Sequence, residues 1–112
     1  MELKKLFNLN GKTALVTGGS QGIGKAISLA LAEFGANLII NYRSGKELAE
    51  ETCREVTNRG VNCHLIASDL SNVSAPKIIS EYVSKNKLEV DILVLNASVQ
   101  FRKSWAQVTP EE

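Results

Sequence analysis

Apolar runs of strand length alternate with segments of helical periodicity along almost the whole chain. Residues 12–17 form a run rich in branched side chains that ends at two glycines, which predicts a buried strand followed by a turn. From Gly22 to Phe34 the apolar residues recur at intervals of three and four, which places them on one face of a helix, and Gly35 is typical of a helix end. A buried strand, a glycine turn and an amphipathic helix in this order indicate the start of a βαβ unit.

The alternation continues after Gly35. We predict further strands at residues 37–42, 62–67 and 90–95 and further helices at residues 44–59 and 72–86. Ser44 and Glu47 have the spacing of a capping box, and Pro76 suits a first helical turn. Apolar strands joined by helices indicate an α/β fold, a doubly wound parallel sheet covered by helices on both faces. Right-handed crossovers then give the strand order 3-2-1-4.

Composition narrows the class of protein. The 112 residues, 44% of them hydrophobic, suit one globular domain, and 2 cysteines are too few for a disulfide scaffold. The 13 Lys and Arg nearly balance the 12 Asp and Glu. Because the basic residues are scattered and form no continuous positive stripe, we expect neither nucleic acid nor a membrane surface as a partner. Because no apolar run reaches membrane-spanning length and the start of the chain lacks a secretory pattern, we expect a cytoplasmic protein.

The glycine-rich turn after the first predicted strand is a candidate phosphate site. The start of a helix there presents unpaired N–H groups and the positive end of the helix dipole. Glycine suits the tight turn at Gly18, the close approach of an anion at Gly22 and the packing of helix on strand at Gly24. The alternative is a turn with a structural role only. The candidate cofactor-binding residues of this segment are Gly18, Ser20, Gln21, Gly22, Ile23 and Gly24.

Three motifs at their present intervals resemble the short-chain dehydrogenase/reductase family. They are Thr17-Gly18-x-x-x-Gly22-x-Gly24, Asp69-Leu70 and Asn96-Ala97. Residues 9–17 look most like those of the 3-oxoacyl-(acyl carrier protein) reductase branch. The resemblance implies a Rossmann-type sheet, truncated to about four strands, and a hydride transfer between NADPH and a carbonyl or alcohol. It implies that residues 1–112 are the N-terminal, cofactor-binding part of a longer homo-oligomeric enzyme, whose C-terminal catalytic part is absent.

The residues after the second predicted strand bear on the choice of nicotinamide cofactor. The adenosine ribose is expected there, about 20 residues beyond the glycines, where an acid would hold a free 2′-hydroxyl. The chain has no acid at this point, and the guanidinium of Arg43 and the hydroxyl of Ser44 suit a 2′-phosphate. We therefore expect NADP(H) rather than NAD(H). The alternative is a solvated Arg43 beside a Ser44 that only caps a helix; Gln21 also departs from the basic residue that many NADP-using relatives carry.

The resemblance assigns roles at the ends of the third and fourth predicted strands. It implies that the Asp69 carboxylate binds the adenine amino group beside the Leu70 backbone, with an Asx turn as the structural alternative. It also places Asn96, Ala97 and Ser98 near the cofactor ribose. Leu95 and Ser98 differ from the family pattern Asn-Asn-Ala-Gly, in which they replace the first Asn and the Gly.

No catalytic residue and no metal site is assigned. The family uses a Tyr-x-x-x-Lys pair and a serine for proton transfer. Tyr42 and Lys46 have that spacing, but they belong to the adenosine end of the expected site. Cys53, Cys63 and His64 lack the spacing of metal ligands, so packing or surface roles are favoured.

The chain ends in a pattern that is typical of a helix start. Thr109 and Glu112 form a second capping box with a proline between them, which indicates either the front part of a longer protein or a frayed tail. We expect this chain to be the NADP(H)-binding portion of an oxidoreductase, and we expect this portion to be inactive on its own. Two alternatives remain: a naturally short nucleotide-binding or regulatory module that is not catalytic, and a non-functional truncated product.

Overall fold

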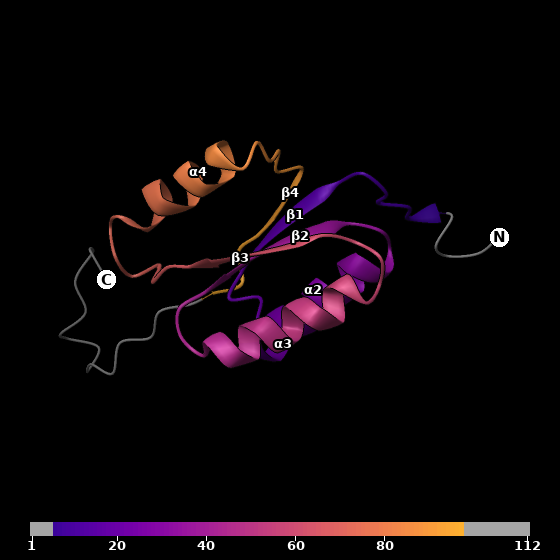
Figure 1. Ribbon diagram of the computed structural model, residues 1–112, viewed down its shortest axis with the longest axis horizontal. Coiled ribbons are helices and arrows are strands. Elements are labelled where there is room, and N and C mark those ends of the chain that lie inside the picture. Colours follow the sequence, from indigo (N-terminus) through magenta and orange to yellow (C-terminus); the bar gives the residue numbers. More distant parts are fainter. Residues whose placement is uncertain (1–5, 98–112) are drawn as a thin grey trace, which may run out of the picture.

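The computed structural model describes residues 6–97, which form a parallel sheet between two layers of helices (Figure 1). Helices α2 and α3 cover one face of the sheet, and α4 covers part of the other. The elements are β1 (Thr13–Thr17), α2 (Gly22–Glu33), β2 (Asn37–Tyr42), α3 (Lys46–Thr57), β3 (Cys63–Ala67), α4 (Ala75–Lys85) and β4 (Ile92–Val94). The predicted α/β fold is therefore confirmed.

The sheet has the order β3-β2-β1-β4, and all three pairings are parallel. Both the strand order and the Rossmann-like topology agree with the sequence prediction. Thr17 of β1 pairs with Asn41 of β2, which in turn pairs with Ile66 of β3. The carboxyl ends of the strands therefore meet at one edge of the sheet, where ligands bind in folds of this type.

Two hydrophobic clusters lie on opposite faces of the sheet, because successive side chains of a strand point in opposite directions. On the α2 and α3 face, Val16 and Leu38 pack with Val56, and all three are fully buried. On the α4 face, Leu15 and Ile39 pack against partly buried side chains of α4. The strands β1 and β2 are apolar on both faces, as the sequence predicts. Within residues 6–97 every helix is too short or too polar to span a lipid bilayer.

The predicted capping box at the start of α3 is wrong. The residue that precedes the helix is Gly45, which has a left-handed backbone (φ 78°), and no side chain caps the helix. This turn starts the helix at Lys46, so Ser44 lies one residue too early to cap its first turn. The predicted helix end at Gly35, whose backbone is left-handed (φ 100°), and the position of Pro76 in the first turn of α4 are confirmed.

Candidate functional site

A cleft of about 280 Å³ lies at the carboxyl ends of the strands. It is lined by Gly18, Ser20, Gln21, Asn41, Tyr42, Arg43, Ser44, Ser68, Asp69, Leu70, Asn96 and Ala97. Nine of these residues are sequence candidates, and Tyr42 lies at the cleft as its expected place at the adenosine end implies, while Asn41 and Ser68 were not predicted. Among the other candidates, Gly22 and Ile23 are exposed at the start of α2 and Gly24 is buried. Ser98 lies outside the described residues.

The three glycines of the turn meet three different steric demands. Gly18 has a positive φ of 63°, and a β-carbon there would lie 3.2 Å from Cα of Ala97. Gly22 also has a positive φ (59°), but the space beside it is open. At Gly24 a β-carbon would overlap the carbonyl oxygen of Gly18 and lie 2.6 Å from Nδ2 of Asn96. The tight turn at Gly18 and the close packing at Gly24 agree with the sequence prediction.

The end of β4 is tied to the end of β1 by side-chain hydrogen bonds. The Asn96 side chain donates from Nδ2 to the Gly18 carbonyl oxygen at 3.1 Å. The Thr17 hydroxyl oxygen accepts from the backbone N–H groups of Asn96 (2.9 Å) and Ala97 (3.1 Å). It also donates to the carbonyl oxygen of Val94 at 3.3 Å. Asn96 therefore shapes the glycine turn from the far end of the described chain.

Asn41 connects three strand ends from inside the protein. Its side chain is 1% exposed; Oδ1 accepts from the Gly18 N–H at 3.3 Å, and Nδ2 donates to the Ser68 carbonyl oxygen at 3.0 Å. The Gly19 N–H donates to the backbone carbonyl of Asn41 at 3.2 Å. A polar residue at the end of an otherwise apolar strand was the only signal in the sequence that pointed to it.

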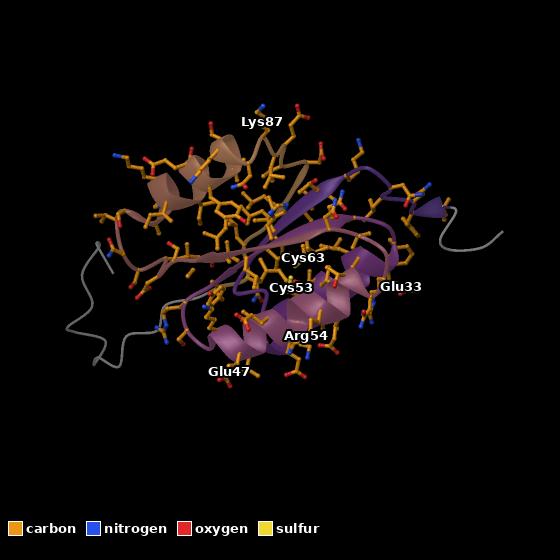
Figure 2. All side chains as sticks on the ribbon, in the orientation of Figure 1. Glu33, Glu47, Cys53, Arg54, Cys63 and Lys87 are labelled. Atoms are coloured by element: carbon orange, nitrogen blue, oxygen red, sulfur yellow. The ribbon has the colours of Figure 1, made fainter. Side chains whose placement is uncertain are left out.

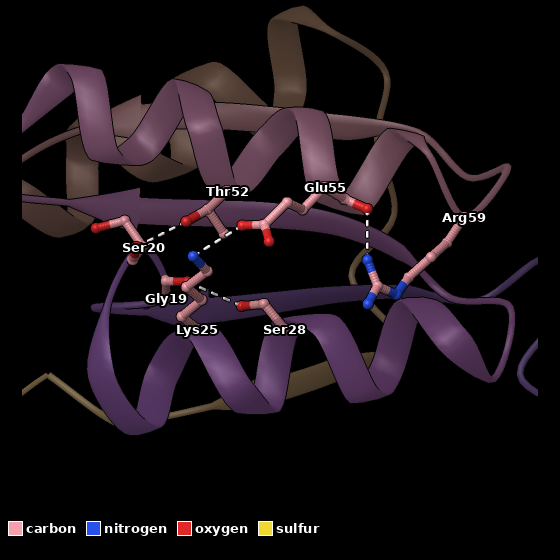
Figure 3. Close-up of polar contacts among 7 residues, drawn as sticks. All are labelled: Gly19, Ser20, Lys25, Ser28, Thr52, Glu55 and Arg59. Atoms are coloured by element: carbon pink, nitrogen blue, oxygen red, sulfur yellow. Dashed lines mark hydrogen bonds and ion pairs between the residues drawn. The ribbon is translucent and has the colours of Figure 1, made fainter.

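Two buried hydroxyl groups hold the next carbonyl groups of the turn (Figure 3). Ser28 of α2 lies 3.1 Å from the Gly19 carbonyl oxygen, and Thr52 of α3 donates to the Ser20 carbonyl oxygen at 2.8 Å. An ion pair of 2.8 Å between Lys25 and Glu55 joins the same two helices, and the hydrogen bond to Glu55 raises the pKa of Lys25. The turn is thus held by side chains from both helices of this face.

The mouth of the cleft carries one cationic and one anionic side chain. Arg43 is exposed just after β2, in the turn that leads to α3. The Oδ1 atom of Asp69 accepts from the hydroxyl (2.7 Å) and the N–H (2.9 Å) of Ser71, and these bonds, with a smaller effect of Arg43, hold the pKa of Asp69 below its ordinary value. The Asx turn foreseen as the structural alternative is therefore present. Because both contacts use Oδ1, they leave Oδ2 of Asp69 available to a ligand.

The thiols and the histidine lie away from the cleft lining. Cys53 of α3 and Cys63 of β3 face each other (Figure 2), with Sγ of Cys53 3.7 Å from the carbonyl oxygen of Cys63. Burial raises the pKa of the Cys63 thiol, with a smaller contribution from Cys53. His64 lies 3.1 Å from the Tyr82 hydroxyl. Residues 6–97 hold no group of His, Cys, Asp and Glu suited to a metal ion.

Comparison with known proteins decides the family. The sequence profile described as short chain dehydrogenase matches residues 12–112. This chain belongs to the short-chain dehydrogenase family. It is 44% identical to general stress protein 39 of Bacillus subtilis over 115 residues, which cover 99% of this chain and 39% of that protein. It is 42% identical to the uncharacterized oxidoreductase YhxC of the same species over 97 residues, or 87% of this chain and 34% of that one.

Solved structures of the short-chain dehydrogenase type have the same fold. A 3-oxoacyl (acyl-carrier-protein) reductase from Agrobacterium tumefaciens with NADP bound superposes with a TM-score of 0.82 at 36% identity, over 98% of this chain and 42% of that one. An L-sorbose reductase from Gluconobacter frateurii, complexed with NADPH and L-sorbose, gives a TM-score of 0.81 at 28% identity. This match covers 94% of the present chain and 40% of the reductase. The chain thus spans about two fifths of the length of such relatives.

Proposed function

We propose that residues 1–112 form the NADP(H)-binding portion of a short-chain dehydrogenase/reductase. The full enzyme moves a hydride between NADPH and a carbonyl or alcohol substrate, in the cytoplasm. The observation that carries the proposal is the cleft at the carboxyl ends of the strands, which joins the glycine turn to Arg43, Ser44 and Asp69. The NADP bound to the Agrobacterium tumefaciens relative supports it.

Each part of the cleft suits one part of the dinucleotide. The start of α2 offers unpaired N–H groups to the diphosphate, and the open space beside Gly22 admits it. The guanidinium of Arg43 and the hydroxyl of Ser44 suit the 2′-phosphate, because no carboxylate follows β2 to repel it. Asp69 would accept from the adenine amino group. The Leu70 backbone borders the adenine, and Asn96, Ala97 and Ser98 would approach a ribose.

The cofactor supplies or accepts the hydride, and the described residues only bind and orient it. No Tyr-x-x-x-Lys pair in this sequence belongs to the nicotinamide end of the site, since Tyr42 lines the cleft beside Arg43. The proton-transferring residues and the substrate pocket are therefore assigned to the part of the longer relatives that this chain does not match. On this proposal the 112 residues bind the cofactor and catalyse nothing alone.

The test is a calorimetric titration of the wild-type chain and its variants with NADPH and with NADH, which measures the affinity for each dinucleotide. Arg43→Asp should weaken NADPH binding by about 10-fold or more, because it removes a charge-assisted contact and adds a repulsive carboxylate. The affinity of the same variant for NADH should fall by a smaller factor. Lys77→Asp is the matched control: it makes the same change of charge on a 79% exposed side chain of α4, outside the cleft lining, and should alter neither affinity.

Two results would contradict the proposal. Absence of saturable NADPH binding by the wild-type chain would remove the cofactor assignment. Equal losses of NADPH and NADH affinity in Arg43→Asp would remove Arg43 from the 2′-phosphate, because NADH has no phosphate at that position.

A further inference from the structure

Two consecutive peptide groups of the glycine turn have their carbonyl oxygens directed into the protein. The Gly19 oxygen lies 3.1 Å from the Ser28 hydroxyl, and the Ser20 oxygen accepts from the Thr52 hydroxyl at 2.8 Å. Ser28 and Thr52 are both fully buried, one on α2 and the other on α3 (Figure 3). These oxygens therefore point away from the cleft.

The opposite ends of these peptide groups then point outward. In a trans peptide the C=O and N–H bonds are antiparallel, and this structure has no cis peptide among its described residues. The N–H that shares a peptide with the Gly19 oxygen belongs to Ser20, and the one that shares a peptide with the Ser20 oxygen belongs to Gln21. Both residues line the cleft, and between residues 6 and 97 neither N–H has a hydrogen-bond acceptor.

Among residues 6–97 the Thr52 hydroxyl serves one carbonyl group, whereas the Ser28 hydroxyl is shared between two. The Ser28 hydroxyl has one proton and two acceptors within reach, the oxygens of Gly19 and, at 2.9 Å, Gly24. The Thr52 hydroxyl has the Ser20 oxygen as its one recorded acceptor among the described residues. Thr52 also lies on a different helix from the turn, 32 residues along the chain, so local geometry does not require the contact.

We propose that Thr52 is a positioning residue for phosphate binding. Its hydroxyl fixes the peptide between Ser20 and Gln21 so that the Gln21 N–H donates to a phosphate oxygen of the dinucleotide. Without this hydroxyl the Ser20 carbonyl has no partner among residues 6–97, and the peptide is free to turn its oxygen toward the cleft. A carbonyl oxygen there would repel the phosphate. The inference rests on the proposed function.

The first test compares NADPH affinity in three variants. Thr52→Val keeps the shape but removes the hydroxyl, and we expect NADPH binding to weaken about 5- to 10-fold. Thr52→Ser restores the hydroxyl and should bind within about 2-fold of the wild type. Thr57→Val is the matched control on the same helix, because the Thr57 hydroxyl is exposed and donates to the Arg54 carbonyl oxygen of its own helix.

The same titrations with NADH show which phosphate of the dinucleotide the Gln21 N–H contacts. A loss with both dinucleotides assigns the Gln21 N–H to the diphosphate that they share, and a loss with NADPH alone assigns it to the 2′-phosphate. Unchanged NADPH affinity in Thr52→Val, or a Thr52→Ser variant as weak as Thr52→Val, would overturn the inference. A wild-type chain that does not bind NADPH would overturn the proposed function and the inference with it.

A second test needs no variant. In a ¹⁵N-labelled wild-type sample, saturation with NADPH should move the Gln21 amide proton downfield, as expected for an N–H that donates to a phosphate oxygen. A Gln21 amide proton that does not move downfield while NADPH binds would show that this N–H makes no such bond. This measurement tests the contact of the Gln21 N–H even if Thr52→Val does not fold, and the absence of that contact would overturn the inference.

Discussion

Alanine at position 24 is expected to destabilise the protein, although alanine is the better helix former. Gly24 belongs to the first turn of α2 and is buried, so propensity alone would favour alanine by about 1 kcal/mol. The added β-carbon would overlap the Gly18 carbonyl oxygen and lie 2.6 Å from Nδ2 of Asn96. Neither neighbour can move without straining the 3.1 Å hydrogen bond between them.

The magnitude follows from these terms. Overpacking costs about 1–3 kcal/mol, and loss of the hydrogen bond between Asn96 and Gly18 costs about 1 kcal/mol more. After the gain in propensity, the free energy of unfolding of Gly24→Ala should fall by about 1–3 kcal/mol. Urea unfolding followed by circular dichroism measures this difference.

Two control variants separate the steric effect from backbone effects. Ala26→Gly, at an exposed position of the same helix, should cost about 1 kcal/mol and calibrates helix propensity in α2. Gly22→Ala meets no atom within 4 Å, so it should cost only the roughly 1–2 kcal/mol of a left-handed alanine. A Gly24→Ala protein as stable as the wild type would refute the reasoning.

Three further predictions concern polar groups. Asn41→Ala leaves the Gly18 N–H and the Ser68 carbonyl without their partner, so the free energy of unfolding should fall by about 2–4 kcal/mol in urea; a loss below 1 kcal/mol would contradict this. Ser71→Ala should raise the pKa of Asp69 toward its ordinary value in a ¹³C NMR titration. The wild-type pKa is lowered, so the associated stability is present above the ordinary carboxyl pKa and is lost as the pH falls through the lowered value. Finally, iodoacetamide at pH 8 should modify Cys63 more slowly in the folded protein than in urea, because burial raises its thiol pKa, and equal rates would contradict that burial.

Periodicity predicted the elements well because they depend on local spacing. The helical repeat from Gly22 and the apolar run before Gly18 each describe one element, and both were located within about one residue. The length of the last strand was predicted less well. Residues 90–95 are mostly apolar, but only Ile92–Val94 forms a strand, which pairs with Ala14, Leu15 and Val16 of β1. Which residues of an apolar run pair with a neighbouring strand depends on the tertiary fold, which no local pattern records.

The same distinction applies to the site. Gly18 and the residues at strand ends, such as Arg43 and Asp69, could be predicted from their places in the sequence, and they line the cleft. Asn41, Thr52 and Ser68 were missed, because their contacts depend on which chain segments meet across the sheet. The cap assigned to Ser44 failed for a similar reason, since the backbone turn at Gly45 moved the helix start.

The bonds between the glycine turn and Asn96 also bear on when this protein can bind a ligand during its synthesis. The Thr17 hydroxyl and the Asn96 N–H are 79 residues apart in sequence. At about 5–20 residues per second, a ribosome needs on the order of 4–16 s to make that stretch. Until then the nascent chain has the glycines and Arg43, but it lacks the Asn96 side chain that bonds to the Gly18 carbonyl. The glycine turn can therefore reach the geometry seen here only in the last stage of folding, after the fourth strand has left the ribosome.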